Sequence, residues 1–235
     1  MNRGKPAEVK LLPAYSLAEA ARYLGSHPST LRAWFRGRPY RAKGENRYAK
    51  AVLSPAQSAG EPLSFLDVVE AHVLLAIRKG YRIPLRRFRV AMEHLREIGG
   101  DLHFLAHREF CHDDRDLFLK PEEMLISLSE RGQVVDRQIV AGGLKQLVYG
   151  SDGYADQFYP RLGQQLQKVI VLDARVNSGK PCLARLGVGT QVIAGRFAAG
   201  ERIVDLAQAY GATRDEIEEA LRWDEAMRRQ ERLAA

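Results

Sequence analysis

Side chains that bind metal ions are concentrated in one short segment, which contains His103, His107, Cys111 and His112. His103 and His107 are four residues apart, a spacing that places two imidazoles on one face of a helix. The residues from 108 to 112 have an extended pattern, which would separate these side chains. Neither a Cys-x-x-Cys nor an HExxH motif accompanies them. We therefore predict that this segment holds no metal ion.

Two other short patterns have residue types found in ligand sites but lack the required spacing. The acidic run Asp113, Asp114 and Asp116 does not match the calcium-loop pattern. The run from Gly187 to Thr190 resembles part of a phosphate-binding loop but lacks the terminal Gly-Lys-Thr. No nucleophile, histidine and acid can be grouped from the sequence. We therefore expect no cofactor and no enzymatic activity.

The basic residues indicate a partner more clearly, because they are unevenly distributed. The chain has 235 residues and a net charge of +7. Residues 1–50 contain 11 basic and 3 acidic residues, whereas residues 201–235 contain 6 basic and 9 acidic residues. Positive charge concentrated at one end favours a polyanion partner, most often nucleic acid. A basic tail that only increases solubility is the alternative.

The elements that position these basic residues form a helix-turn-helix pattern. Ser16 and Glu19 have the spacing of a capping box, which predicts a helix from Ser16 to Leu24. Gly25-Ser26-His27 is a turn, and Pro28 suits the first turn of a second helix that Gly37 ends. The basic residues 38–50 then predict a hairpin or irregular wing. We expect Trp34 to belong to the core.

Residues on the second helix and on the wing are the predicted DNA contacts. Arginine can bind guanine through two hydrogen bonds, and hydroxyl groups can reach bases or phosphates. The predicted contacts are Ser29, Thr30, Arg32, Arg36, Arg38, Arg41, Lys43 and Arg47. A solvated helix face and a disordered basic loop are the alternatives.

The whole chain is predicted to be α+β and mostly α-helical, in three domains. Residues 1–100 form a winged helix-turn-helix, with further helices over residues 63–79 and after Pro84. Residues 101–168 alternate short strand-like runs with Asp, Pro and Gly, which indicates a small mixed α/β module. Residues 169–235 form a tri-helical, helix-turn-helix-like domain, whose third helix begins with a capping box of Thr213 and Glu216.

This third C-terminal helix has the shape but not the charge of a DNA-recognition helix. Four carboxylates lie at positions expected to be exposed in its first two turns: Asp215, Glu216, Glu218 and Glu219. Each would repel the DNA backbone, so a basic protein partner or a subunit contact is favoured. The alternative is that these acids only stabilise the helix N-terminus.

The N-terminal part of the chain resembles MerR-type regulators. The matching residues are Ser16, Glu19, Ala20, Ala21, Leu24, Gly25, Ser29, Thr30, Leu31, Arg32 and Trp34, and the segment from Leu75 to Leu95 resembles the downstream region of that family. The insertion before Leu63 is longer than the usual wing. This resemblance implies a DNA-binding head over roughly the first 95 residues.

Residues 169–229 resemble domain of unknown function 433, a tri-helical family regarded as antitoxin-like. The matching residues include Val176, Gly179, Lys180, Pro181, Cys182, Gly189, Thr190, the turn from Phe197 to Glu201, Ile203, Leu206, Tyr210, Thr213, Ile217 and Ala220. Gln191 stands where the family commonly has Arg. The complete arrangement resembles long VapB-type antitoxins.

That resemblance implies neutralisation of a PIN-domain ribonuclease toxin and autoregulation through operator DNA. The candidate toxin contacts are Arg185, Arg196, Arg202 and Arg214, which could pair with metal-site carboxylates, and Asp215, Glu216, Glu218 and Glu219, which could cover a basic RNA-binding rim. A MerR-like transcription regulator without a toxin is the alternative.

The remaining expectations concern assembly and location. A single helix-turn-helix contacts little DNA, so we expect a homodimer that reads two half-sites. No apolar stretch approaches the length of a membrane span, and Met1 to Lys10 lack the apolar core of a signal peptide. Only two cysteines are present, Cys111 and Cys182, which fits a reducing compartment. We therefore expect a cytoplasmic protein without membrane contact.

Overall fold

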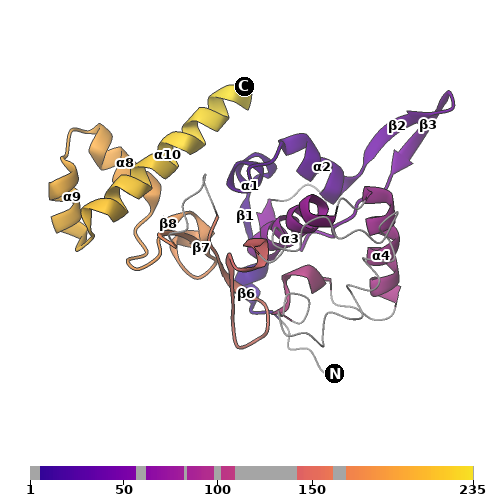
Figure 1. The fold of residues 1–235 in the computed structure, drawn as a ribbon, viewed down its shortest axis with the longest axis horizontal. Coiled ribbons are helices and arrows are strands. Elements are labelled where there is room, and N and C mark those ends of the chain that lie inside the picture. The colour runs from indigo at the N-terminus through magenta and orange to yellow at the C-terminus, as the bar shows by residue number, and fades with distance from the viewer. Residues whose placement is uncertain are drawn as a thin grey trace. The chain divides into compact units, whose positions relative to one another are not determined.

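The computed structural model describes residues 6–56, 62–81, 84–97, 102–108, 142–160 and 168–234. The chain divides into two compact units, Met1–Ala155 and Asp156–Ala235 (Figure 1). The acidic run 113–116 and most of the predicted middle module lie outside the described residues. The boundaries 1–100, 101–168 and 169–235 therefore stay predictions. None of the described helices is long and apolar enough to cross a membrane.

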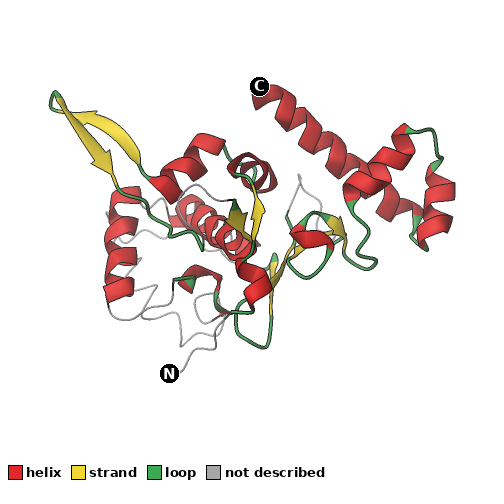
Figure 2. Cartoon of the chain, turned by 180° about the vertical axis from the view of Figure 1, so that it is seen from behind, coloured by secondary structure: helices red, strands yellow, loops and turns green. Residues whose placement is uncertain are grey.

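The first unit is mainly helical. Its elements, in chain order, are η1 Glu8–Leu11, β1 Pro13–Tyr15, α1 Leu17–Tyr23, α2 Pro28–Arg36, β2 Arg38–Ala42, β3 Glu45–Ala49, β4 Leu63–Ser64, α3 Phe65–Tyr81, α4 Leu85–Glu97, η2 Phe104–Ala106 and β5 Leu147–Tyr149. Strand β1 pairs antiparallel with β4, and β2 pairs antiparallel with β3. The β2–β3 hairpin extends away from the helices in both views (Figures 1 and 2).

Helices α1 and α2 form the predicted helix-turn-helix. The capping box is present, since Ser16 Oγ accepts from the Glu19 N–H at 3.2 Å and Glu19 Oε2 accepts from the Ser16 N–H at 2.9 Å. Ala20 and Ala21 are fully buried, so α1 and α2 pack closely. The N-cap of α2 is His27, whose Nδ1 accepts from the Ser29 N–H at 3.2 Å.

The core of the first unit lies around α3. The α3 residues Val68, Val69, Val73 and Leu74 are fully buried, and α3 contacts β1, β4, η1 and η2. Trp34 is only 1% exposed, so its predicted core position is confirmed. Helix α2 packs against α1 and buries Leu31, Trp34 and Phe35, while Arg32 and Arg36 stay exposed.

A partly buried ion pair joins distant parts of this unit. Lys10 is 2% exposed, and its Nζ donates to both carboxylate oxygens of Asp152 at 2.8 Å. Asp152 also accepts from the Ala7 N–H at 3.1 Å and from the Tyr154 N–H at 3.1 Å. The N-terminal segment is thereby attached to a loop 142 residues further along the chain.

The second unit combines a small antiparallel sheet with three helices. Its elements are β6 Ala155–Phe158, whose first residue belongs to the first unit, β7 Ile170–Asp173, η3 Asn177–Gly179, β8 Cys182–Leu183, α8 Thr190–Ala198, α9 Ile203–Tyr210 and α10 Arg214–Ala234. Strand β7 pairs with β6 and with β8. The sequence predicted the three helices, and β6 falls at the end of the segment predicted to contain short strands, but β7 and β8 were not predicted.

The three helices of the second unit enclose a small core. Ile193 of α8, Leu206 of α9, and Ile217 and Trp223 of α10 are at most 2% exposed. The capping box of α10 is present, since the Glu216 N–H donates to Thr213 Oγ1 at 3.2 Å and the Thr213 N–H donates to Glu216 Oε2 at 2.7 Å. The observed fold is α+β and mostly helical, which confirms the predicted fold class.

Candidate nucleic-acid interface

The exposed face of α2 carries two of the predicted DNA contacts. Arg32 and Arg36 are exposed and four residues apart, so they lie on one face of the helix. Trp34 and Leu31 are buried on other faces. In the part of the chain that the structure describes, neither guanidinium forms an ion pair. Both are therefore available to an external anion.

The predicted hydroxyl contacts lie in the first turn of α2. Ser29 is exposed, and its Oγ lies 2.7 Å from His27 Nδ1. Thr30 is half-buried. The first-turn N–H groups of a helix attract phosphate, so this end is suited to a backbone contact. His27 was not singled out from the sequence, because Gly25-Ser26-His27 already satisfied the turn pattern.

The hairpin β2–β3 is the predicted wing. Its register pairs Arg38 with Ala49 and Arg41 with Asn46, and its two-residue turn is Lys43-Gly44. Both turn residues have positive φ, 53° and 83°, which is the type I′ geometry that fits the twist of a hairpin. The extended basic segment thus has defined structure rather than being a disordered loop.

The four basic residues of the wing that were predicted to contact DNA are all exposed: Arg38, Arg41, Lys43 and Arg47. Arg41 Nε donates to Asn46 Oδ1 at 3.3 Å. Arg47 pairs with Glu45 at 3.1 Å, but both side chains are at least half exposed. Such a surface pair is worth at most about 1 kcal/mol, so a phosphate can displace it.

Two buried carboxylates lie in α3, a feature absent from the predicted site. Asp67 and Ser64 form a capping box, with the Ser64 N–H donating to Asp67 Oδ2 at 2.7 Å and the Asp67 N–H donating to Ser64 Oγ at 3.2 Å. The Ala56 N–H donates to Asp67 Oδ1 at 3.0 Å. Burial raises the pKa of the Asp67 carboxyl, and these hydrogen bonds oppose the rise.

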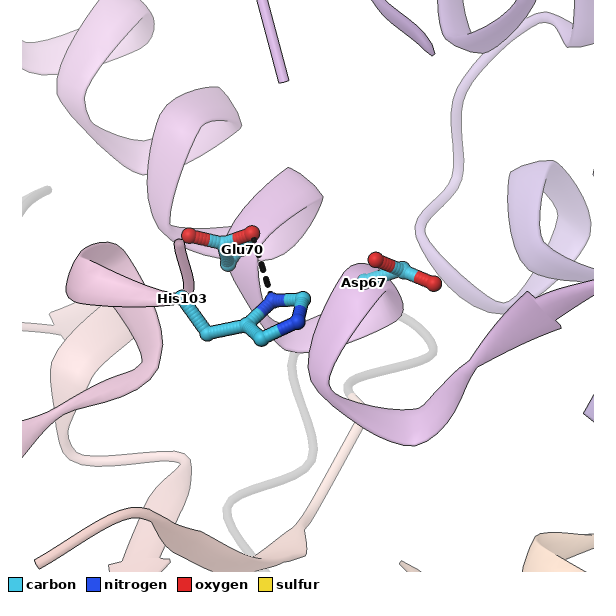
Figure 3. A group of neighbouring side chains, drawn as sticks. All are labelled: Asp67, Glu70 and His103. Carbon is cyan, nitrogen blue, oxygen red and sulfur yellow. Dashed lines mark hydrogen bonds and ion pairs between the residues drawn. The ribbon is translucent and has the colours of Figure 1, made fainter. Parts of the chain in front are cut away.

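The second buried carboxylate, Glu70, pairs with His103. Glu70 Oε2 lies 3.1 Å from His103 Nδ1, and Glu70 Oε1 accepts from the Leu105 N–H at 3.3 Å. Figure 3 shows the imidazole between the carboxylates of Glu70 and Asp67. Burial raises the pKa of Glu70, while the hydrogen bond from His103 lowers it. Asp67 and Glu70 are fully buried and His103 is 4% exposed.

This cluster is the group of described residues best placed for a metal ion. Ligand atoms of Asp67, Glu70 and His103 lie within 4.8 Å of one another. Every carboxylate oxygen already has a partner in the chain, three of them a backbone N–H and the fourth the His103 imidazole. These contacts explain the cluster without a metal ion, as a buried structural link between α3 and η2. A sequence signal existed, because both acids interrupt the apolar run of residues 65–77.

The histidine segment is not assembled as the four-residue spacing suggested. Residues 104–106 form η2, and the His107 ring packs edge-to-face on Tyr154 with 4.8 Å between centroids. His103 instead faces α3. Cys111 and His112 lie outside the described residues, so the absence of a metal site among them stays a prediction.

The four arginines proposed as toxin contacts are all bound to carboxylates of the second unit. Arg185 holds Glu216 through two hydrogen bonds of 3.1 and 2.8 Å, and it also donates to the Gly211 carbonyl at 2.8 Å. Arg196 pairs with Glu201 and lies 5.0 Å from the centre of the Tyr210 ring. Arg185 and Arg196 thus stabilise the α9–α10 turn and the α8–α9 turn.

The other two arginines form pairs within a helix or at its start. Arg202 donates to both oxygens of Asp205 at 2.7 and 2.8 Å, and Arg214 donates to Glu218 at 2.7 Å. Their side chains are 78% and 71% exposed. They are the two candidate arginines that a partner protein can reach most readily.

The expected exposure of the α10 carboxylates is only partly correct. Asp215 is exposed, but the side chains of Glu216 and Glu219 are 16% and 17% exposed, and that of Glu218 is 34% exposed. Each of these three glutamates pairs with an arginine of the same unit. The hydrogen bonds from Arg185 lower the pKa of Glu216 to about 2. The sequence pattern could not reveal these partners, since Arg185 is 31 residues from Glu216.

Comparison with known proteins follows the same division of the chain. Residues 13–92 match a family described as "Putative DNA-binding HTH domain", and residues 170–223 match "Protein of unknown function (DUF433)". A Mycobacterium tuberculosis protein named "Putative antitoxin VapB45" is 29% identical over an alignment of 226 residues, and the match covers 89% of this chain and 93% of that protein.

A solved structure shows the same similarity. The crystal structure of Rv2018 from Mycobacterium tuberculosis has a TM-score of 0.64 and 28% identity, and the match covers 89% of this chain and 98% of that one. The N-terminal part of the chain is therefore similar to a DNA-binding helix-turn-helix family, and the chain resembles a VapB-type antitoxin over most of its length. The expected resemblance to domain of unknown function 433 is confirmed, and so is a helix-turn-helix in the N-terminal part, whereas the MerR-type family itself stays a prediction.

Proposed function

We propose that this chain is the antitoxin of a type II toxin–antitoxin pair, a cytoplasmic, non-enzymatic protein that neutralises a PIN-domain ribonuclease and binds its own operator. The observation that carries the proposal is the two-part similarity to the protein named VapB45, which extends over 93% of that relative. The geometry of the described residues supports it, because exposed basic side chains without acidic partners are concentrated on α2 and the wing.

The DNA-binding role belongs to α2 and the wing. Arg32 and Arg36 would face the bases of the major groove, and Arg38, Arg41, Lys43 and Arg47 would contact phosphates. Ser29 and Thr30 would contact the backbone at the N-terminus of α2. A homodimer would place two such heads on the half-sites of one operator, since one head covers too little DNA for useful specificity.

The toxin-binding role belongs to the second unit. Among the eight proposed contacts, Arg202 and Arg214 are the most exposed arginines and Asp215 is also exposed, whereas Arg185, Arg196 and Glu216 stabilise turns of the unit. Val192, Phe197 and Val204 are also exposed, at 53%, 44% and 61%. Apolar side chains next to paired charges have the composition of a protein–protein interface, with an apolar centre and a polar rim.

Two variants of the full-length protein, each expected to lose one activity and keep the other, test both roles. Val204→Asp with Phe197→Asp changes only exposed positions, and we expect it to release the co-expressed toxin while operator binding persists. Arg32→Ala with Arg36→Ala should abolish operator binding while the toxin still co-purifies and its ribonuclease activity stays inhibited. Gel-shift titration and an RNA cleavage assay measure the two activities.

Each alternative outcome points to a different function. If the Arg32 and Arg36 variant releases the toxin and the Val204 and Phe197 variant retains it, the toxin site has been assigned to the wrong unit. If operator DNA is bound but no protein from the neighbouring reading frame co-purifies, the MerR-like regulator without a toxin is the better description.

A further inference from the structure

The junction between α2 and the wing is unusually tight. Gly37, which follows the last residue of α2, has φ +75° and ψ −175°, a conformation open essentially to glycine. A Cβ atom at this position would lie 2.4 Å from the Ala49 carbonyl oxygen and 2.9 Å from Cε1 of Tyr48. Strand β3 therefore lies directly against the turn, and the recognition helix continues into the wing without a spacer.

Tyr48 closes this junction from the wing side. Its hydroxyl donates to the carbonyl oxygen of Arg36, the last residue of α2. Carbonyl groups in the last turn of a helix lack an intrahelical partner, so this hydrogen bond satisfies one of them. The Tyr48 residue is 62% exposed, and burial of its ring in the core does not account for its position. The hydrogen bond and the contact with Gly37 define the place of the ring.

The other anchors of the wing act on the outgoing chain after β3. The Val52 and Leu53 N–H groups donate to the Trp34 carbonyl at 2.7 and 3.1 Å, and Arg89 Nε of α4 donates to the Lys50 carbonyl at 2.7 Å. These bonds hold the chain beyond the hairpin and involve no residue of β2 or β3. The Tyr48 hydroxyl, in contrast, connects the hairpin itself to the end of α2.

We propose that Tyr48 is a positioning residue that locks the wing to the recognition helix, so that both enter DNA as one rigid unit. This inference rests on the proposed DNA-binding role of the head. Operator binding requires that Arg32 and Arg36 on α2 and the basic residues of the wing find their targets together. A wing that is already fixed loses less conformational entropy on binding. The smaller entropy loss strengthens the specific complex most, because that complex requires the wing and α2 in one defined arrangement.

The test compares Tyr48→Phe with Tyr40→Phe in the full-length protein. Tyr40 is the other tyrosine of the hairpin, lies on its opposite face, is 42% exposed and forms no hydrogen bond within the described part of the chain. We expect Tyr48→Phe to weaken specific operator binding roughly 3- to 10-fold, the range for one hydrogen bond. Binding to non-specific DNA and the salt dependence should stay unchanged, because no cation is removed. Tyr40→Phe should change none of them.

A second measurement on the free protein separates this inference from the proposed function. Amide hydrogen exchange over residues 38–49 should be faster in Tyr48→Phe than in the wild type and in Tyr40→Phe, while the melting temperature stays the same. If exchange is unchanged, Tyr48 does not restrain the wing, and the inference is wrong whether or not the protein binds DNA. An equal loss of specific and non-specific binding would also overturn it.

Discussion

The two units of the molecule differ in how their charged side chains are paired and exposed. In the first unit, Arg32, Arg36, Arg38 and Lys43 are exposed and have no carboxylate partner among the described residues. Two of its carboxylates, Asp67 and Glu70, are fully buried. In the second unit, each of the four arginines proposed as toxin contacts is bound to a carboxylate, and the pairs lie at the surface.

This difference in pairing indicates which partners each unit can attract, which the net charge alone does not. An exposed cation without a partner keeps its counterions until a polyanion replaces them, and their release drives binding to DNA. A paired cation has little further electrostatic interaction to offer. The two units therefore present different surfaces to partners, one that attracts phosphate and one on which exposed apolar side chains have relatively more weight. The following predictions test this contrast, beginning with the largest expected effect.

Breaking the buried pair of the first unit should have the largest effect. His103→Ala leaves the Glu70 carboxylate buried without its imidazole partner, which typically costs about 3–5 kcal/mol. Urea denaturation of the full-length variant, followed by hydrogen exchange in α3, measures the loss. The matched control is Arg202→Ala, which breaks an exposed pair. Equal destabilisation by both variants would remove the distinction between buried and surface charge.

Removing the unpartnered arginines should affect binding but not folding. Arg32→Ala and Arg36→Ala should each weaken operator binding by about 1–3 kcal/mol if the side chain contacts a base, with little change in stability. Arg214→Ala in the second unit is the control, and we expect it to leave DNA affinity unchanged. The contrast fails if Arg214→Ala lowers the affinity as much as Arg32→Ala does.

The two units should respond to acid in opposite directions. The pKa of Glu216 is lowered from 4.5 to about 2, so its pair with Arg185 contributes stability above pH 4.5 and loses it as the pH falls towards 2. The pKa values of Asp67 and Glu70 are raised, so protonation of these carboxyls favours the folded first unit as the pH falls through that raised range.

Hydrogen exchange between pH 5 and pH 2.5, corrected for intrinsic rates, resolves the two units. Protection in α10 should decrease over this range, and Glu216→Gln should make the decrease smaller. Glu70→Gln should remove part of the acid-dependent gain in α3. The prediction is wrong if α10 loses no protection in the wild-type protein or if Glu216→Gln leaves the profile unchanged.

The smallest effect is expected for an exposed pair along one helix. Arg214→Ala removes an i, i+4 contact with Glu218, and such pairs contribute about 0.3–0.5 kcal/mol. Thermal unfolding at low and high salt measures it, because the contribution should diminish when salt screens the pair. A loss above 1 kcal/mol would indicate that this pair supports the fold as Arg185 and Glu216 do.

Features that depend on neighbouring residues could be predicted from the sequence. The capping boxes of Ser16 with Glu19 and of Thr213 with Glu216 span three residues, and both are present. Gly37 ends α2 as expected, and the basic segment after it forms a hairpin. Helix and turn signals of this kind are local, so no tertiary information is needed to read them.

Contacts between distant residues could not be predicted. His103 forms a hydrogen bond with Glu70, which is 33 residues away in the sequence. The two-residue strand β8 is defined by its pairing with β7. The carboxylates of α10 were predicted to be exposed, because a helical pattern shows which residues share a face. It does not show which arginine will pair with each carboxylate. The same limit applies to Tyr48, whose hydroxyl reaches Arg36 only after the hairpin has formed.

The pair of Lys10 and Asp152 also sets an order of events during synthesis. Translation proceeds at about 5–20 residues per second, so the 142 residues between the partners take roughly 7–28 s to make. During that interval Lys10 lacks its Asp152 partner, so η1 can contact α3 but cannot form this ion pair. The helix-turn-helix is translated early, but the unit that carries it closes only when residues 152–154 are available. The chain is thus produced in the order helix-turn-helix, Asp152 loop, second unit, and the first unit is completed only shortly before the second one begins to form.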